Sequence, residues 1–544
     1  MHRSTAILTA ALLVCVLLVP LSEADAATHE ETLSDGTTYN YTTQGNDYAS
    51  YCATMNTASS DLEGVWLSTT LEGYNVTAIG EDAADLPNAT YVVIPERVLT
   101  IGSGAFSACE SLTDVYFLGD MPEIADGAFP DGVSFHVVSG TSGWDSYEGT
   151  LDYIEEATLE PSDGSSVRYL IIEGEAAAFE AEPSEDGSVT VESEVSGYPV
   201  TSVAAYCMAG GDNEDGTEVE PRTDVVSVTI GEGVTVIRER AFYYSTGLES
   251  AELPDSLEVI MDEAFRAAYS LTSADIPDGV WYLGFESFRH CTSLPSAVIP
   301  DAVTFIGEGV FKVCSSMESL VIGSGLEEIS EWAFCYCYDL VSVEFRGSPT
   351  VIGAEAFYNC PSLVSIELPD SVESIGAEAF YYCTSLQSID LGSSLVSIGS
   401  IAFQSCSSLE TITFPETLDS IGRKAFAYCT SLTDAVFLGP MPEIDSTAFL
   451  SDSVTIHVTS EYADSWASYD GTVVVDAVSE DDSSSDSDDG DDASGTDDSS
   501  SDSDDSSSGS DDGDDDGTIL LIAVVVVVVC VIAVCAVALR RRSG

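Results

Sequence analysis

Phenylalanine recurs from Phe242 to Phe449 of this 544-residue chain at a constant interval of 23 residues, and this period constrains the fold more than any other feature. Each unit also carries aliphatic residues at fixed offsets, as in Leu386, Ile389 and Leu391. A unit this short cannot bury its apolar side chains alone, whereas stacked neighbours share one core. The period therefore predicts a solenoid. The series comprises Phe242, Phe265, Phe288, Phe311, Phe334, Phe357, Phe380, Phe403, Phe426 and Phe449.

The spacing inside one unit predicts its local structure. The step of two between Ile389 and Leu391 indicates a short strand with alternate residues directed inward. Gly392 then marks a turn, and Ala402 with Phe403 lies in a second compact turn. We expect a parallel β-sheet on one face of the solenoid and short turns, 3-10 turns or helical turns on the other.

The solenoid pattern occurs twice. Residues 109–129 nearly repeat residues 429–449, and the His136 and His457 segments that follow also correspond. We interpret these as two copies of a C-terminal cap. The sequence thus predicts a short module over residues 27–157 and a long module of about ten repeats over residues 158–476.

One unit reads Ile375-Gly376-x-x-Ala379-Phe380-x-x-Cys383-x-Ser385-Leu386. This motif resembles the BspA-like leucine-rich repeat family, clearly from Val236 to Phe449 and in part of the first 150 residues. The resemblance implies a leucine-rich-repeat solenoid and, for function, adhesion to extracellular matrix or other cells. It implies no binding residues, because the motif positions form the core.

Both ends of the chain carry targeting features. Residues 1–26 combine Arg3, an apolar run and a small-residue cleavage site, which is typical of a secretory signal peptide. Residues 518–539 are apolar and long enough for a transmembrane helix. The arginines in the tail, residues 540–544, favour its cytoplasmic location. We therefore expect a single-pass cell-membrane protein with its N-terminal ectodomain outside the cell.

The segment 477–517, which joins the repeats to the predicted helix, is dominated by Asp and Ser and contains no basic residue. Such a composition cannot build a core, so we expect a disordered stalk. The whole chain has 15 Lys and Arg against 94 Asp and Glu, a formal net charge of −79. Phosphate binding needs clustered cations, so the charge excludes nucleic acid as a partner.

Cysteine occupies one repeat position, three residues after each phenylalanine, in seven consecutive units. We interpret this ladder as a row of buried small side chains, because free cysteine packs well in cores. Some disulfides and a metal column remain as alternatives, although parallel side chains on stacked repeats are poorly placed for bridging. The ladder comprises Cys291, Cys314, Cys337, Cys360, Cys383, Cys406 and Cys429.

The outward strand positions provide a candidate ligand face, in which small hydroxyl groups lie beside carboxylates. The competing interpretation is an ordinary solvated sheet face without a ligand. A tyrosine-rich turn is a second candidate, with partial burial as its alternative. The ligand face comprises Ser319, Ser342, Glu344, Ser365, Glu367, Ser388, Asp390, Thr411 and Thr413. The turn carries Tyr243, Tyr244, Tyr336, Tyr358, Tyr381, Tyr382 and Tyr428.

Three N-glycosylation sequons begin at Asn40, Asn75 and Asn88, all in the first module. The five histidines are scattered, and no nucleophile elbow, zinc-protease helix or phosphate loop is present in the sequence. We therefore expect no enzymatic activity, no cofactor and no metal site.

Two functions fit these features. The first is a cell-surface adhesin or receptor-like protein that binds an extracellular protein or glycan. The second is a structural envelope or surface-coat protein without a specific ligand. The sequence does not specify the ligand or the oligomeric state.

Overall fold

The computed structural model describes residues 28–476, except 33–36, 45–51, 60–61, 72–73, 148, 213–218 and 451–453. All described residues belong to one compact unit. The predicted signal peptide, stalk, transmembrane helix and tail lie outside them. Within the described part of the chain, no helix has the length and apolarity needed to span a membrane.

The first module winds two sheets around a common core. Its main sheet is parallel, and its second sheet begins with the antiparallel strands β1, β2 and β3 before continuing in parallel. The main sheet contains β4 (Gly64–Trp66), β8 (Tyr91–Ile94), β10 (Asp114–Phe117), β12 (Ser134–Val137) and β13 (Leu151–Tyr153). The second contains β1 (Thr28–Thr32), β2 (Thr38–Gln44), β3 (Cys52–Ser59), β5 (Thr70–Leu71), β6 (Tyr74–Ile79), β7 (Ala84–Asp85), β9 (Thr100–Ile101) and β11 (Glu123–Ile124).

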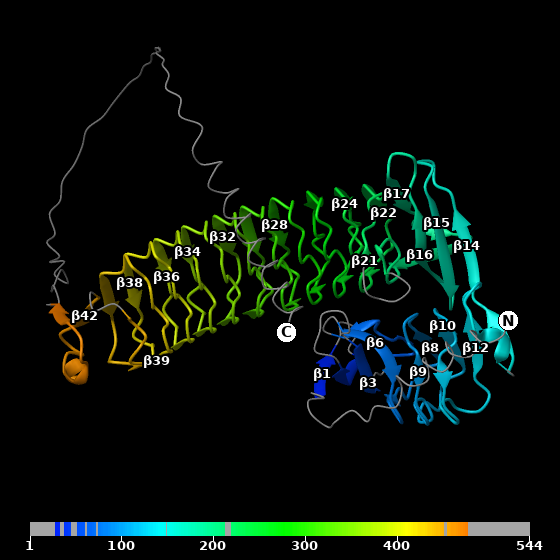
Figure 1. Cartoon of the computed structure of the whole chain (residues 1–544), viewed down its shortest axis with the longest axis horizontal. Helices are drawn as coiled ribbons and strands as arrows, with labels where there is room; N and C mark the ends of the chain where they lie inside the picture. The colour runs from blue at the N-terminus through cyan, green and yellow to red at the C-terminus, as the bar shows by residue number, and fades with distance from the viewer. Residues whose placement is uncertain are drawn as a thin grey trace, which may run out of the picture. The chain divides into compact units, whose positions relative to one another are not determined.

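The long module repeats this plan over more turns, which Figure 1 shows stacked side by side. Its main sheet divides into four hydrogen-bonded groups. These contain β17 (Ser188–Val191), β22 (Ser227–Ile230), β24 (Ser250–Glu252) and β26 (Ser273–Ala274); β28 (Ser296–Ile299), β30 (Ser319–Ile322) and β32 (Ser342–Phe345); β34 (Ser365–Glu367) and β36 (Ser388–Asp390); and β38 (Thr411–Phe414), β40 (Asp434–Phe437), β42 (Thr455–Thr459) and β43 (Val473–Asp476).

The opposite side of the long module carries a second ladder of strands, mostly two residues long. From the sequence we expected only turns there. From β19 onward most of these strands pair in parallel with the strand one turn away, as Ser374 and Ile375 do with Ser397 and Ile398. Strands β14, β15 and β16 pair antiparallel. This side contains β14 (Glu155–Leu159), β15 (Ser166–Ile172), β16 (Glu175–Glu182), β18 (Glu194–Val195), β19 (Tyr198–Val203), β23 (Val236–Ile237), β25 (Val259–Ile260), β27 (Tyr282–Leu283), β29 (Phe305–Ile306), β31 (Glu328–Ile329), β33 (Val351–Ile352), β35 (Ser374–Ile375), β37 (Ser397–Ile398), β39 (Ser420–Ile421) and β41 (Glu443–Ile444).

Helix is confined, among the described residues, to two 3-10 segments, η1 (Trp144–Ser146) and η2 (Ser465–Ser468). They occupy corresponding places in the two predicted caps. A small hairpin of β20 (Gly211–Asp212) and β21 (Val219–Glu220) completes the strands. Of the expected short turns, 3-10 turns or helical turns, the described phenylalanine segments form short hydrogen-bonded turns.

The phenylalanine turns from Phe242 to Phe426 each contain at least one left-handed residue other than glycine. Glu378 has φ 57° and Tyr382 has φ 64° in one such turn. This conformation costs roughly 1–2 kcal/mol per residue. It directs both N–H groups at the next turn, where Glu378 donates to the carbonyl of Ser400 at 3.0 Å and Tyr382 to that of Gln404 at 2.9 Å. Hydrogen bonds between turns therefore hold this strained backbone in place.

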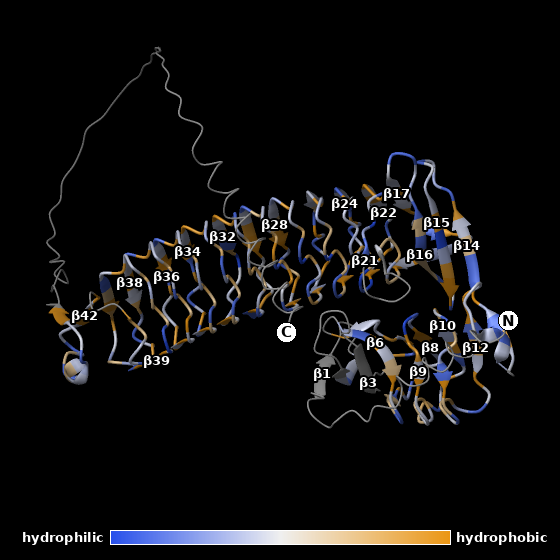
Figure 2. Ribbon diagram, viewed as in Figure 1, coloured by the Kyte–Doolittle hydropathy of each residue, from blue (hydrophilic) through white to orange (hydrophobic). Residues whose placement is uncertain are grey.

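The core is a file of stacked phenylalanine rings, and Figure 2 shows apolar residues recurring on every turn. Phe357 and Phe380 have centroids 5.3 Å apart with rings 6° from parallel, and Phe380 repeats this with Phe403 at 5.1 Å and 5°. All three side chains are fully buried. The ring of one turn is thus covered by its neighbours in the adjacent turns.

The seven ladder cysteines are free and buried beside this file. Each Sγ donates to a phenylalanine carbonyl 26 residues earlier, as Cys383 does to Phe357 at 3.2 Å and Cys406 to Phe380 at 3.2 Å. The same contact recurs at Cys291, Cys314, Cys337, Cys360 and Cys429. The arrangement agrees with the packing interpretation.

The two modules pack against each other through the main sheet of the first. Strand β14 crosses the predicted boundary at residue 157 and pairs with β15. Val93, Tyr116 and Leu118 form one buried cluster with Leu170 and Ile172 of β15. The hydroxyl of Tyr116 also lies 2.6 Å from Oε1 of Glu173. The outward face of the first main sheet is therefore covered by protein.

A buried network of ion pairs extends from this junction into the long module. Arg240 pairs with Glu263 and donates to Asn75 Oδ1 of the first module. The Glu263 side chain is fully buried and also pairs with Arg266, which lies 2.9 Å from Glu286. Both guanidinium groups hold the pKa of Glu263 below its usual range, against the opposing effect of burial. The network thus keeps these charges compensated where water is excluded.

We expect Phe357→Ala to lower the free energy of unfolding by about 3–5 kcal/mol, because it opens a cavity in the ring file. Val341→Ala is the matched control, since Val341 is 49% exposed and its truncation should cost about 0.5 kcal/mol or less. Urea unfolding followed by circular dichroism measures both. Equal losses in the two variants would contradict the stacked core.

The cysteine ladder predicts a loss of stability at alkaline pH. Burial raises the pKa of Cys383 to about 12, while an unfolded thiol titrates near about 8.5. The unfolded chain therefore loses protons first, and stability should fall as pH rises from about 9 toward 12. Unfolding midpoints from pH 7 to pH 11 test this, with Cys383→Ala reducing the slope. A pH-independent midpoint would show that the thiols are not buried.

Removing Arg240 should destabilise the junction strongly. Arg240→Met leaves Glu263 with one cation fewer and removes the guanidinium donor of Asn75, so we expect a loss of about 3 kcal/mol. Arg346→Met is the control, because its 3.3 Å contact with Glu344 is exposed and worth about 0–1 kcal/mol. Denaturant titration of both variants makes the comparison, and a smaller loss for Arg240→Met than for Arg346→Met would refute it.

Candidate binding face

All nine residues of the predicted ligand face are exposed in the structure. They lie on the outward side of strands β30 to β38, while Ile366 and Ile389 between them are buried. The register brings equivalent residues together, so Ser365 pairs with Ser388 and Glu367 with Asp390. The strand alternation alone produces this separation of polar and apolar side chains.

The face is flat and rich in hydrogen-bond acceptors. Carboxylates of Glu344, Glu367 and Asp390 lie on successive turns beside a column of hydroxyl groups. Arg346 approaches Glu344, and both side chains remain largely exposed. Such a surface can accept hydrogen bonds from hydroxyl or amine groups and attract cations.

At the C-terminal end of the face, Asp434 joins a small hydrogen-bonded group. Its carboxylate lies 2.6 Å from the Thr433 hydroxyl and 2.8 Å from Nε2 of His457. Hydrogen bonds from Thr433 and His457 hold the pKa of Asp434 below its usual value. The first cap repeats the contact between Asp114 and His136 at 2.7 Å. This correspondence follows the duplicated cap sequences.

The equivalent face of the first module is buried, whereas that of the long module is exposed. In the alignment of the two caps, Tyr116 is equivalent to Val436, and their strand partners Val93 and Thr413 are equivalent to each other. Val93 and Tyr116 are 1% and 7% exposed beneath the long module, whereas Thr413 is exposed. The position shared by Val93 and Thr413 is therefore apolar where protein covers it and polar where it is open.

The tyrosine-rich turn is mostly half-buried. Tyr358 stacks on Tyr381 at 4.8 Å and contacts Tyr336 at 5.3 Å, so these rings cover one another along the solenoid. Tyr382 and Tyr428 are more open, at 47% and 60% exposure. The turn thus forms a packed edge with a few projecting rings.

The three sequons fall in different surroundings. Asn88 is exposed in a turn, and Asn40 lies within β2 with its side chain partly accessible. Asn75 accepts a hydrogen bond from Arg240 at the module junction. Glycosylation of these residues stays a prediction, for which Asn88 has the most open position.

Sequence reasoning missed two features of the long module. One is the buried ion-pair network, whose signal is the run of Arg266, Arg289 and Lys312 at one repeat position. The other is an exposed aromatic side chain, Phe305, on the second sheet. Its signal is an aromatic residue at the same repeat position in two successive units, Tyr282 and Phe305.

No group of three or more His, Cys, Asp or Glu residues able to hold a metal ion occurs in the described ranges. His136 and His457 each contact one carboxylate, so neither has the ligand set of a structural metal site.

Comparisons with known proteins agree with this repeat architecture. A family model described as "BspA type Leucine rich repeat region" matches in six copies, over residues 68–141, 221–341 and 350–462. These matches cover more than half of the chain. A search of curated protein sequences finds no significant match.

Several solved structures are similar. A leucine-rich repeat protein from T. pallidum has 26% identity and a TM-score of 0.32, covering 36% of this chain and 87% of its own. A leucine-rich cell surface protein from Faecalibacterium prausnitzii has 22% identity and a TM-score of 0.28, covering 76% and 96%. The pneumococcal vaccine antigen PcpA has 17% identity and a TM-score of 0.28, covering 59% and 98%.

The repeat motif, the stacked turns and the extent of the family match lead to one conclusion: the chain belongs to the BspA-type leucine-rich repeat family.

Proposed function

We propose that this protein is a cell-surface adhesin or receptor-like protein, anchored by its C-terminal helix, whose long module binds an extracellular protein or glycan. The observation that carries the proposal is the contrast between the two main sheets. The first is covered by the chain itself through Tyr116 and its neighbours, whereas the second presents Glu344, Glu367 and Asp390 on an open face.

The family and the predicted targeting segments support surface display. A similar leucine-rich repeat protein, from Faecalibacterium prausnitzii, is described as a cell surface protein. The acidic and hydroxyl-rich face suits contacts with ligands that donate hydrogen bonds or carry positive charge. Nucleic acid and anionic lipid are unsuitable partners for a chain with a net charge of −79.

A structural surface-coat role is the second candidate. The regular turns and the continuous hydrophobic core of the long module favour this role. A stiff solenoid can space or cover a surface without any ligand. In that case the polar face is simply the solvated side of a sheet.

A ligand array probed with the full-length chain separates the two functions. We expect saturable binding that falls at least about tenfold when Glu344, Glu367 and Asp390 are replaced by alanine, since a loss near 1.4 kcal/mol corresponds to tenfold in affinity. The control replaces Glu373, Asp419 and Glu443 by alanine. These residues are exposed on the second-sheet side, and their replacement removes the same charge.

Two outcomes would count against adhesion through this face. Equal losses in both triple variants would indicate general charge attraction, which also weakens with salt. Uniform silence across the array, together with ordered cross-linked assemblies of the chain, would favour the surface-coat role.

A further inference from the structure

Outward positions of the second sheet form a column whose side chains are buried at its start and exposed further along the long module. Val259 and Tyr282 are buried in the hydrophobic core of the first module. One turn further, Phe305 is 44% exposed, whereas Tyr282 is only 5% exposed. The next residue of the column is Glu328, which is exposed. Phe305 is therefore the first aromatic side chain of this column that the first module leaves uncovered.

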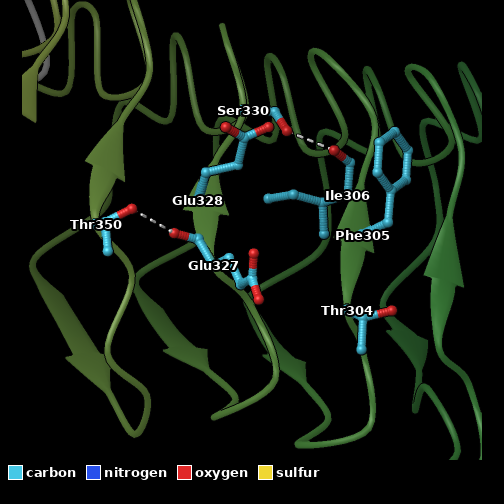
Figure 3. A pocket seen from close by; sticks show the side chains of 7 residues that line it. All are labelled: Thr304, Phe305, Ile306, Glu327, Glu328, Ser330 and Thr350. Carbon is cyan, nitrogen blue, oxygen red and sulfur yellow. Dashed lines mark hydrogen bonds between the residues drawn. The ribbon is translucent and has the colours of Figure 1, made fainter.

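A pocket of about 330 Å³ lies beside Phe305, and Figure 3 shows the side chains around it. It occurs where the second sheet is interrupted, because β29 and β31 belong to separate hydrogen-bonded sheets. The buried Ile306 forms part of its wall. The other lining residues are Thr304, Phe305, Glu327, Glu328, Ser330 and Thr350. We refer to this as the Phe305 pocket.

The lining combines an aromatic ring with two carboxylates and no basic residue. One face of the Phe305 ring stacks on Tyr282, at 4.9 Å and 10° from parallel, so the ring is fixed in orientation. The hydroxyl of Ser330 donates to the carbonyl of Ile306, and that of Thr350 to the carbonyl of Glu327. The carboxylates of Glu327 and Glu328 are left as the charged acceptors of the pocket.

An oriented aromatic ring beside carboxylates is the chemistry that recognises organic cations. The ring face attracts positive charge, and carboxylates form paired hydrogen bonds with a guanidinium group. This protein already uses such contacts, with Arg238 over the Trp66 ring at 3.9 Å and Lys312 over Trp332 at 4.1 Å. A planar guanidinium also matches a stacked aromatic pair better than a compact ammonium does.

We propose that the Phe305 pocket binds a guanidinium group, supplied by an arginine side chain of a partner protein. The stacked ring supplies one planar surface, while Glu327 and Glu328 supply acceptors and charge. The large negative charge of the chain raises the local concentration of cations, and the ring gives the pocket its selectivity among them. The pocket lies on the second sheet, so this proposal does not depend on ligand binding at the main-sheet face.

Saturation-transfer NMR with the full-length chain and Nα-acetyl-arginine amide tests the proposal. We expect transfer to the side-chain protons next to the guanidinium, with affinity about two- to fivefold weaker in Phe305→Ala. Phe305→Leu should lose as much, because it keeps apolar area without an aromatic face. Glu327→Gln with Glu328→Gln should weaken binding further, by about tenfold.

Three comparisons decide whether the pocket recognises the guanidinium itself. Nα-acetyl-citrulline amide, the neutral analogue, and methyl glucoside should give no transfer, and Nα-acetyl-lysine amide should give less. Asp419→Asn with Glu443→Gln removes the same charge from exposed positions that do not line the pocket, and it should leave the signal unchanged. Unchanged binding in Phe305→Leu, equal transfer to citrulline, or an equal loss in the variant with Asp419→Asn and Glu443→Gln would overturn the proposal. Circular dichroism verifies that each variant keeps its strands.

Discussion

Contact between one turn and the next is the constraint on which the rest of this structure depends. A single turn offers a phenylalanine ring, a thiol and a few aliphatic side chains, none of which it can bury alone. The neighbouring turns complete the burial of Phe380, accept a hydrogen bond from the Cys383 thiol and accept those of left-handed N–H groups such as that of Tyr382. The fold is therefore a chain of nearest-neighbour contacts, with no central nucleus.

The sequence predicted the parts of the fold that follow from this constraint. Fixed offsets between Leu386, Ile389 and Phe403 identify the inward positions, and a step of two leaves residues such as Ser388 exposed. The second ladder of strands was not predicted, because two-residue strands such as Ser397–Ile398 are too short for a periodic signal. Left-handed Glu378 and Tyr382 were also missed, since neither residue type favours that conformation without its neighbouring turn.

The sites that depend on tertiary packing were out of reach of the sequence. Tyr116 and Leu118 follow the same alternation as Val436 and Leu438, yet only the first pair is covered by β15. Likewise, Phe305 and Tyr282 occupy equivalent positions in successive turns. Tyr282 is buried and Phe305 is exposed because the first module covers this column only as far as Tyr282. The predicted ligand face could be located by periodicity, whereas the Phe305 pocket required knowledge of the module junction.

The core pattern that successive turns share also has an evolutionary consequence. Segments such as residues 360–382 and 383–405 carry the same core pattern, so a genetic exchange between them adds or deletes one complete turn. Each such event would lengthen or shorten the molecule by about 4.8 Å, the spacing of paired strands, and leave both caps unchanged. The length of the solenoid can thus vary in discrete steps among descendants without a new fold having to arise.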